Sequence, residues 1–329
     1  MSIRVFARSI SRPVRKRLCR PGETQRCGQV LAVFERACHL ATPTGEIVAL
    51  VTPQIGDGPL NIVVGDGSTG PFAAVDPGTP ATLERDQLRI GRLQVDLGEA
   101  QVWEPRPDWK ALRTRQAAIR SHLPFLHALC QSQAPAGSLL ALLGGRRAPE
   151  GASLLELNNA AVHRAASALL RGWERGAARR ADWQSVSQQP RRAVRRSECH
   201  SDLQKGAAGL AGLGGGLTPA GDDFLMGAMV WAWLTHPTPE ALCQALAETA
   251  APRTTALSAA FLRAAARGEC HADWHTLLAA LSAGPDATET VNISMAVQHI
   301  LSHGATSGAD GLAGFLYLSR GTCYTLPHT

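Results

Sequence analysis

The chain has 329 residues, of which 45% are hydrophobic and 18% are charged, and its formal net charge is +6. This balance excludes a disordered or fibrous protein and supplies enough apolar residues for two ordinary domains or one large one. The basic residues are nearly all arginines, whose planar donors suit small acidic ligands, although a coding bias toward Ala, Gly and Arg explains the same count.

The first hundred or so residues are predicted to form strands. Short runs rich in apolar and β-branched residues cover Val30–Phe34, Ile47–Val51, Leu60–Val64 and Leu88–Leu97. Turn-forming residues separate these runs, as in the Asp76-Pro77-Gly78 triplet. This spacing predicts an antiparallel sheet or a small barrel, which we assign to a first domain over residues 1–105.

From Trp109 onward the pattern becomes helical, because apolar residues recur at intervals of three and four. We predict helices over Ser153–Arg171, Asp222–Leu234, Pro239–Thr249, Thr255–Arg267, Ala272–Leu281, Thr290–Leu301 and Asp310–Leu318. The predicted fold class is therefore α+β, with an antiparallel β-rich domain followed by a mainly helical domain over residues 106–329.

Arginines are concentrated between Arg171 and Arg196. We interpret this segment as a solvated helix end and loop. A nucleic-acid surface is the alternative, but few aromatic residues accompany the arginines and no known binding motif is present. We expect no nucleic-acid partner.

The spacing of the cysteines and the length of the apolar runs bear on the cellular compartment in which the protein is expected. Eight cysteines are scattered along the chain and none forms a C-x-x-C pair, which argues against a disulfide scaffold or a zinc ribbon and for a reducing environment. The longest apolar run, Phe224–Leu234, is too short to span a membrane. The basic N-terminus lacks a secretory apolar block. We expect a cytoplasmic protein without a membrane partner.

One glycine-rich segment, residues 209–227, stands apart. Glycines allow positive φ and close approach to a ligand. Thr218 is predicted as the N-cap of the following helix and Pro219 as its first residue. A glycine loop that leads into a helix start offers N–H groups and the positive end of the helix dipole to an anion. The candidate anion-binding residues here are Gly214, Gly215, Gly216, Thr218 and Gly221.

Asp222 and Asp223 follow the glycines and are the candidate catalytic residues. Adjacent helical residues point about 100° apart, so the two do not act as one chelating pair. One of them would stabilise the helix start while the other faces the site. The alternative is purely structural: a cap, with Gly221 and Gly227 providing tight helix packing.

Two further predicted helix starts repeat this chemistry. Thr254 and Thr255 precede Ser258, and Thr306-Ser307-Gly308 precedes Asp310. Each places hydroxyl groups before an apolar helix, which is also ordinary capping chemistry. Three such starts in one helical domain could converge on one pocket, and all seven residues are candidate ligands of a small anionic substrate.

Metal and nucleophile motifs are weak. Histidine pairs at i and i+4 occur, but no acidic third ligand is placed as in H-E-x-x-H and Asp273 is expected on another face, so the sequence assigns no metal site. No G-x-S-x-G elbow is present. The sequence requires no cofactor, and Mg²⁺ stays open.

The glycine segment carries a family resemblance. Residues 212–224, G-L-G-G-G-L-T-P-A-G-D-D-F, strongly resemble the G-L-G-x-G-L-T-P-S-G-D-D-F signature of the AllH-like family. The segment from Thr306 to Gly314 is similar to its second signature. Gly215 stands where a proline is common, Ala220 where a serine is usual, and Ala305 where a histidine is frequent. The resemblance covers the C-terminal half well and the N-terminal part only in general layout.

This resemblance implies a component of oxamate carbamoyltransferase in allantoin degradation, acting with two unrelated partner proteins. That reaction moves a carbamoyl group between oxalurate and phosphate, giving oxamate and carbamoyl phosphate. The glycine loop would hold phosphate or the tetrahedral oxyanion. Asp222 or Asp223 would accept hydrogen bonds from the carbamoyl NH₂ or act as a base, and Arg253 would bind the carboxylate of oxamate. Self-association stays open.

Three alternatives remain. The chain could be a non-catalytic scaffold or ligand-sensing subunit, or it could act on a related carbamoyl compound. A Mg²⁺-dependent phosphate-handling enzyme that uses the aspartates as ligands is the third hypothesis.

Overall fold

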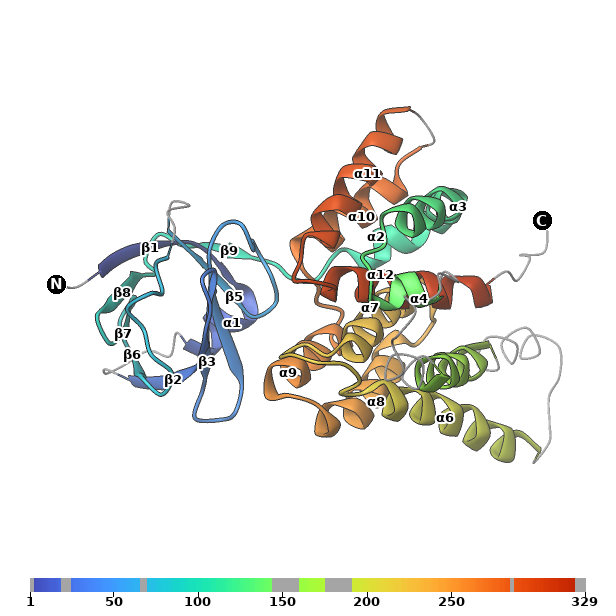
Figure 1. The fold of residues 1–329 in the computed structure, drawn as a ribbon, viewed down its shortest axis with the longest axis horizontal. Coiled ribbons are helices and arrows are strands. Elements are labelled where there is room, and N and C mark those ends of the chain that lie inside the picture. The colour runs from blue at the N-terminus through green and yellow to red at the C-terminus, as the bar shows by residue number, and fades with distance from the viewer. Residues whose placement is uncertain are drawn as a thin grey trace. The chain divides into compact units, whose positions relative to one another are not determined.

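The chain divides into two compact units that are not consecutive in sequence. Met1–Pro107 and Glu269–His275 form the first unit, and Asp108–Gly268 and Thr276–Thr329 form the second. Figure 1 shows the computed structural model. It describes residues 3–18, 25–65, 70–143, 160–174, 191–284 and 287–322.

The first unit is built on a nine-stranded sheet that closes into a barrel (Figure 1). Its strands are β1 (Ile3–Ser11), β2 (Gln25–Val33), β3 (Ala37–Ala41), β4 (Ile47–Val51), β5 (Asn61–Val64), β6 (Pro80–Glu84), β7 (Gln87–Ile90), β8 (Leu93–Asp96) and β9 (Gln101–Trp103). They lie in the order β5-β4-β3-β2-β6-β7-β8-β1-β9, and an antiparallel pairing of β5 with β1 closes the ring. Helix α1 (Arg12–Leu18) follows β1.

The barrel confirms the predicted β-rich N-terminal part. Alternate residues of β6, β7 and β8 are buried, as expected for strands with one face on a core. The predicted run Leu88–Leu97 is two strands rather than one, because Gly91 turns the chain with a φ of 57°. The sequence did not predict β1, β3, β6 or β9. Among the pairings of β1, those with β8 and β9 are parallel.

A short segment returns to the first unit from far along the chain. The N–H of Cys270 donates to the Pro105 carbonyl at 2.9 Å, and that of Ala272 donates to the Asp57 carbonyl at 3.0 Å. The rings of His275 and Trp103 lie 5.1 Å apart. No local pattern in the sequence predicts this return.

The second unit is helical. Its described helices are α2 (Trp109–Thr114), α3 (Gln116–Gln133), α4 (Leu139–Leu143), a helix over residues 160–174, α6 (Arg191–Leu210), α7 (Ala220–Thr235), α8 (Pro239–Ala250), α9 (Ala256–Ala266), α11 (Ala287–Leu301) and α12 (Ser307–Ser319). Helix α10 (Ala272–Ser282) begins in the returning segment. Seven helices were predicted, and each corresponds to one of these within a few residues, except that residues 153–159 lie outside the described part.

The arginine-rich segment needs a correction. Residues 191–196 begin the long helix α6 and are not a loop. Residues 171–174 end the preceding helix, and residues 175–190 lie outside the described part. No helix in the described part of the chain is long and apolar enough to cross a membrane.

Helices α7 and α12 form the centre of the second unit and touch backbone to backbone. A Cβ atom on Gly227 would overlap the carbonyl oxygen of Gly311, and one on Gly314 would overlap the carbonyl oxygen of Phe224. Glycine alone permits this approach. All residues of α7 from Gly221 to Leu234 are buried except Met226. The two helices therefore behave as one rigid body that carries both of their N-terminal ends.

Gly227→Ala tests this contact. The added methyl group has no room, so we expect a loss of about 3 kcal/mol or more in the free energy of unfolding, seen as a melting temperature lower by roughly 6–12 °C. Gly284→Ala is the matched control, because a Cβ there meets no atom within 4 Å. Equal melting temperatures for the two variants would contradict the tight helix contact.

Candidate functional site

The three predicted helix starts do meet. The Thr218 and Ser307 hydroxyls, from the starts of α7 and α12, lie 3.0 Å apart. The Thr255 hydroxyl, at the start of α9, donates to the carbonyl of Leu217. These contacts join segments that are separated by up to 89 positions in sequence. All of them lie within the second unit.

Asp222 holds this arrangement together. Its side chain is fully buried, with 0% of its surface exposed. One carboxylate oxygen accepts the N–H of Gly212 at 3.0 Å, and the other accepts the hydroxyls of Thr254 and of Ser258, the latter at 2.8 Å. Both oxygens are thus occupied by the protein, and Asp222 ties the glycine loop to the start of α9.

The local caps differ from those expected. Pro219, not Thr218, occupies the N-cap position of α7, which begins at Ala220, and no side chain caps it. Thr255 does cap its helix, because its hydroxyl oxygen accepts the N–H of Ser258 at 3.1 Å. Thr306 occupies the N-cap position of α12 without a side-chain capping bond.

The predicted anion-binding glycines fall into two groups. Gly221 and Gly308 serve packing: a Cβ on either would overlap a carbonyl oxygen, and their N–H groups donate to Leu213 and His303. The other three glycines are exposed and open to solvent, and they are Gly214, Gly215 and Gly216. In the described part of the chain, the N–H groups of Gly215 and Gly216 donate to no protein acceptor.

Asp223 has a different environment from its neighbour Asp222. Only 4% of its surface is exposed, and its Oδ2 atom has no hydrogen-bond partner among the described residues. Burial raises the pKa of Asp223 well above its ordinary range, and the nearby charges of Asp310 and Asp222 raise it further, while a hydrogen bond from Ser307 opposes the rise. Asp223 is therefore a buried acid suited to carrying a proton.

Asp310 is the second buried acid. Its side chain is 0% exposed, and Oδ1 accepts the N–H of Leu139, at the start of α4, at 2.6 Å. Its Oδ2 atom has no partner in the described part. Burial raises the pKa of Asp310 to about 6, although the Leu139 N–H and the Thr306 hydroxyl favour the charged form.

A chain of hydroxyl groups leads from the surface to Asp223. Thr218 and Ser307 are half-buried, and Ser307 bonds both to Thr218 and to the Asp223 carboxyl. Such a chain can pass a proton between a ligand bound at the loop and the buried acid. The sequence could not separate the roles of Asp222 and Asp223, whereas their hydrogen bonds do.

The hydrogen bond that the Arg253 side chain makes is not to these carboxyl groups. Its guanidinium is exposed and donates to the Thr249 carbonyl of the preceding helix. Its own carbonyl oxygen packs against Gly212, where a Cβ atom would overlap it. Binding of a substrate carboxylate by Arg253 stays a prediction.

The environments of three buried cysteines do not favour a reactive thiolate. Burial raises the pKa of Cys27 and Cys38 to about 11 and that of Cys130 to about 12. Thiols in such surroundings are protonated at neutral pH and inert.

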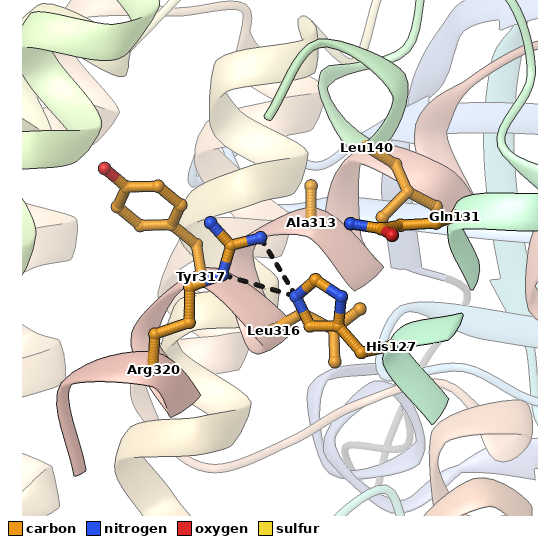
Figure 2. A pocket seen from close by; sticks show the side chains of 7 residues that line it. All are labelled: His127, Gln131, Leu140, Ala313, Leu316, Tyr317 and Arg320. Atoms are coloured by element: carbon orange, nitrogen blue, oxygen red, sulfur yellow. Dashed lines mark hydrogen bonds between the residues drawn. The ribbon is translucent and has the colours of Figure 1, made fainter. Parts of the chain in front are cut away.

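A pocket missed by the sequence analysis lies along the C-terminal half of α12 (Figure 2). Its lining residues are His127, Gln131, Leu140, Ala313, Leu316, Tyr317 and Arg320. The Arg320 guanidinium bonds to Nε2 of His127 at 2.9 Å and lies over the Tyr317 ring. Burial and the charge of Arg320 lower the pKa of His127, so the histidine stays neutral. These polar groups satisfy one another, and the pocket is separate from the helix-start cluster.

Two family models match the chain. The model described as oxamate carbamoyltransferase subunit AllH matches residues 210–319, and the one described as the AllH family N-terminal domain matches residues 6–102. The first match spans the glycine loop and all three helix starts, and the second spans nearly the whole barrel. No curated protein and no solved structure matches the chain.

Asp222→Ala tests the structural role of Asp222. It leaves the Gly212 N–H and two hydroxyls without their acceptor, so we expect a loss of about 3 kcal/mol or more in the free energy of unfolding. Asp222→Asn keeps the size and an acceptor and should lose less. Urea unfolding monitored by circular dichroism measures both. A stable Asp222→Ala variant would contradict the tie between the loop and α9.

Asp310→Asn tests the buried acid through pH. A carboxyl whose pKa rises from 3.8 to about 6 on folding binds its proton more tightly when folded, so it lowers stability as pH rises through that interval. The neutral amide still accepts from Leu139. We expect it to stabilise the protein by on the order of 3 kcal/mol near pH 7.5 and by much less near pH 4. The same effect at both pH values would refute the raised pKa.

Proposed function

The chain belongs to the AllH family, whose name denotes a subunit of oxamate carbamoyltransferase, and we propose that it supplies catalytic residues to that reaction. The observation that carries this proposal is Asp223, a nearly fully buried acid at the end of a hydroxyl chain and beside an exposed glycine loop. As a subunit, the chain acts within an assembly, and we propose two further proteins as its partners.

The proposed reaction needs one proton to move. A phosphate oxygen attacks the carbamoyl carbon of oxalurate, and a tetrahedral oxyanion forms. The bond from that carbon to the amide nitrogen then breaks, which releases carbamoyl phosphate and oxamate. The proton lost by the phosphate hydroxyl ends on the nitrogen of oxamate, so atoms and charge balance. A group that accepts and returns one proton therefore lowers the barrier.

The residues of the cluster match these needs. Asp223 is the proposed proton carrier. Burial raises its pKa well above the ordinary range, which favours the form that gives a proton to the leaving nitrogen and regains one from the phosphate hydroxyl. The N–H groups of Gly215 and Gly216 are the proposed donors to phosphate or to the oxyanion. Asp222 is a positioning residue, since both of its oxygens are occupied by the protein.

A non-catalytic scaffold or ligand-sensing subunit is the second candidate. The observation in its favour is that Gly221, Gly227 and Gly308 are explained by packing alone. Mg²⁺ also stays a proposal, in which the oxygens without partners on Asp223 and Asp310 would be its ligands. A related carbamoyl acceptor would use the same residues.

Asp223→Asn tests the catalytic role. The amide keeps the shape but carries no titratable proton, so we expect carbamoyl phosphate formation from oxalurate and phosphate to fall by about 100-fold or more in the reassembled complex. Glu248→Gln is the matched control, because this carboxylate is exposed on α8 and bonds only to Gln244 among the described residues. It should retain full activity.

The alternatives give other results in the same assay. A normal rate for Asp223→Asn in an intact complex would assign catalysis to a partner and leave this chain as a scaffold. Loss of the wild-type rate on addition of a chelator would point to the magnesium hypothesis instead.

A further inference from the structure

At the helix starts, two buried carboxyl oxygens have no hydrogen-bond partner in the part of the chain that the structure describes: Oδ2 of Asp223 and Oδ2 of Asp310. Less than a tenth of the surface of either residue is exposed to solvent. Leaving an acceptor unsatisfied in such a place is costly, so native proteins rarely do it without a functional reason.

The two oxygens come from a rigid frame. Ser307 and Asp310 are three residues apart on α12 and so share one face of that helix. Asp223 on α7 bonds to Ser307, which brings it to the same face. Because α7 and α12 touch through Gly227 and Gly311, the two acids cannot move apart without disrupting the helix pair.

Among the described residues, the donors that act on the two acids do not reach these Oδ2 atoms. Leu139 bonds to Oδ1 of Asp310, and Ser307 bridges Thr218 and Asp223. The remaining need is for N–H donors brought by a ligand. A primary amide carries two N–H groups on one nitrogen, which matches two acceptor oxygens on neighbouring helices once Asp223 has given its proton to that nitrogen.

We propose that Asp223 and Asp310 together form a subsite for the amide nitrogen of the carbamoyl acceptor, with the carboxylate of that ligand directed toward the exposed glycine loop. This inference rests on the proposed function and adds Asp310 as a specificity-determining residue. The nitrogen that exchanges the carbamoyl group thus lies beside the proton carrier, and a compound with a methyl group in its place is rejected.

Oxamate and pyruvate test this subsite, since they share charge and shape and differ in an NH₂ or a CH₃ group. Calorimetric titration of the full chain should show oxamate binding tighter than pyruvate by about tenfold or more. In Asp310→Asn, an amide that accepts from Leu139 turns its own N–H groups toward the ligand. That variant should lose most of the preference for oxamate, while Glu248→Gln keeps it.

The outcomes separate the two proposals. Equal affinity of the wild-type chain for oxamate and pyruvate would overturn the subsite and leave the proposed function intact. An unchanged preference in Asp310→Asn would remove Asp310 from the subsite. Failure of the chain to bind either compound would overturn the subsite as well, and a normal rate for Asp223→Asn in the activity assay would count against the proposed function alone.

Discussion

The arrangement of the site depends on one buried carboxylate. Asp222 accepts hydrogen bonds from the glycine loop at Gly212 and from the α9 start at Thr254 and Ser258. Since Asp222 itself belongs to α7, this side chain fixes the relative positions of three segments. A carboxyl group this deeply buried is tolerated because three protein donors reach its two oxygens. The exposed residues of the glycine loop are held in place by the buried side chain of Asp222.

The second constraint is the backbone contact between α7 and α12. It gives the carboxyls of Asp223 and Asp310 a fixed spacing in surroundings that favour their neutral forms. Burying two acids side by side opposes folding, and the close packing of two apolar helices offsets that effect. Shifted pKa values of this kind are typical of functional sites, where burial stabilises a protonation state that the same group would not adopt in water.

The sequence predicted a β-rich part followed by a helical part, together with its helices, because periodicity is a local signal. Glycine-aspartate clustering singled out residues at the helix starts, but it left open whether those starts meet. The sequence could not assign different roles to Asp222 and Asp223. The partners of Asp222 at the start of α9 lie 32 and 36 positions away, and Ser307, which acts on Asp223, lies farther still along the chain on α12. Nor could the sequence show that Gly221 serves packing rather than ligand binding, because its contact is with Leu210 in the folded chain. The parallel pairings of β1 likewise depend on strands formed much later in the sequence.

The segment Glu269–His275 gives the first unit an unusual order of completion. During synthesis the nine strands leave the ribosome first, yet the hydrogen bonds of Cys270 to Pro105 and of Ala272 to Asp57 need residues made after most of the second unit. Domains usually fold in the order in which they emerge. Here the barrel cannot be completed until the segment Glu269–His275 has been synthesised. A fragment that ends at Pro107 would therefore lack a piece of the first unit. The two units are thus coupled during synthesis as well as in sequence.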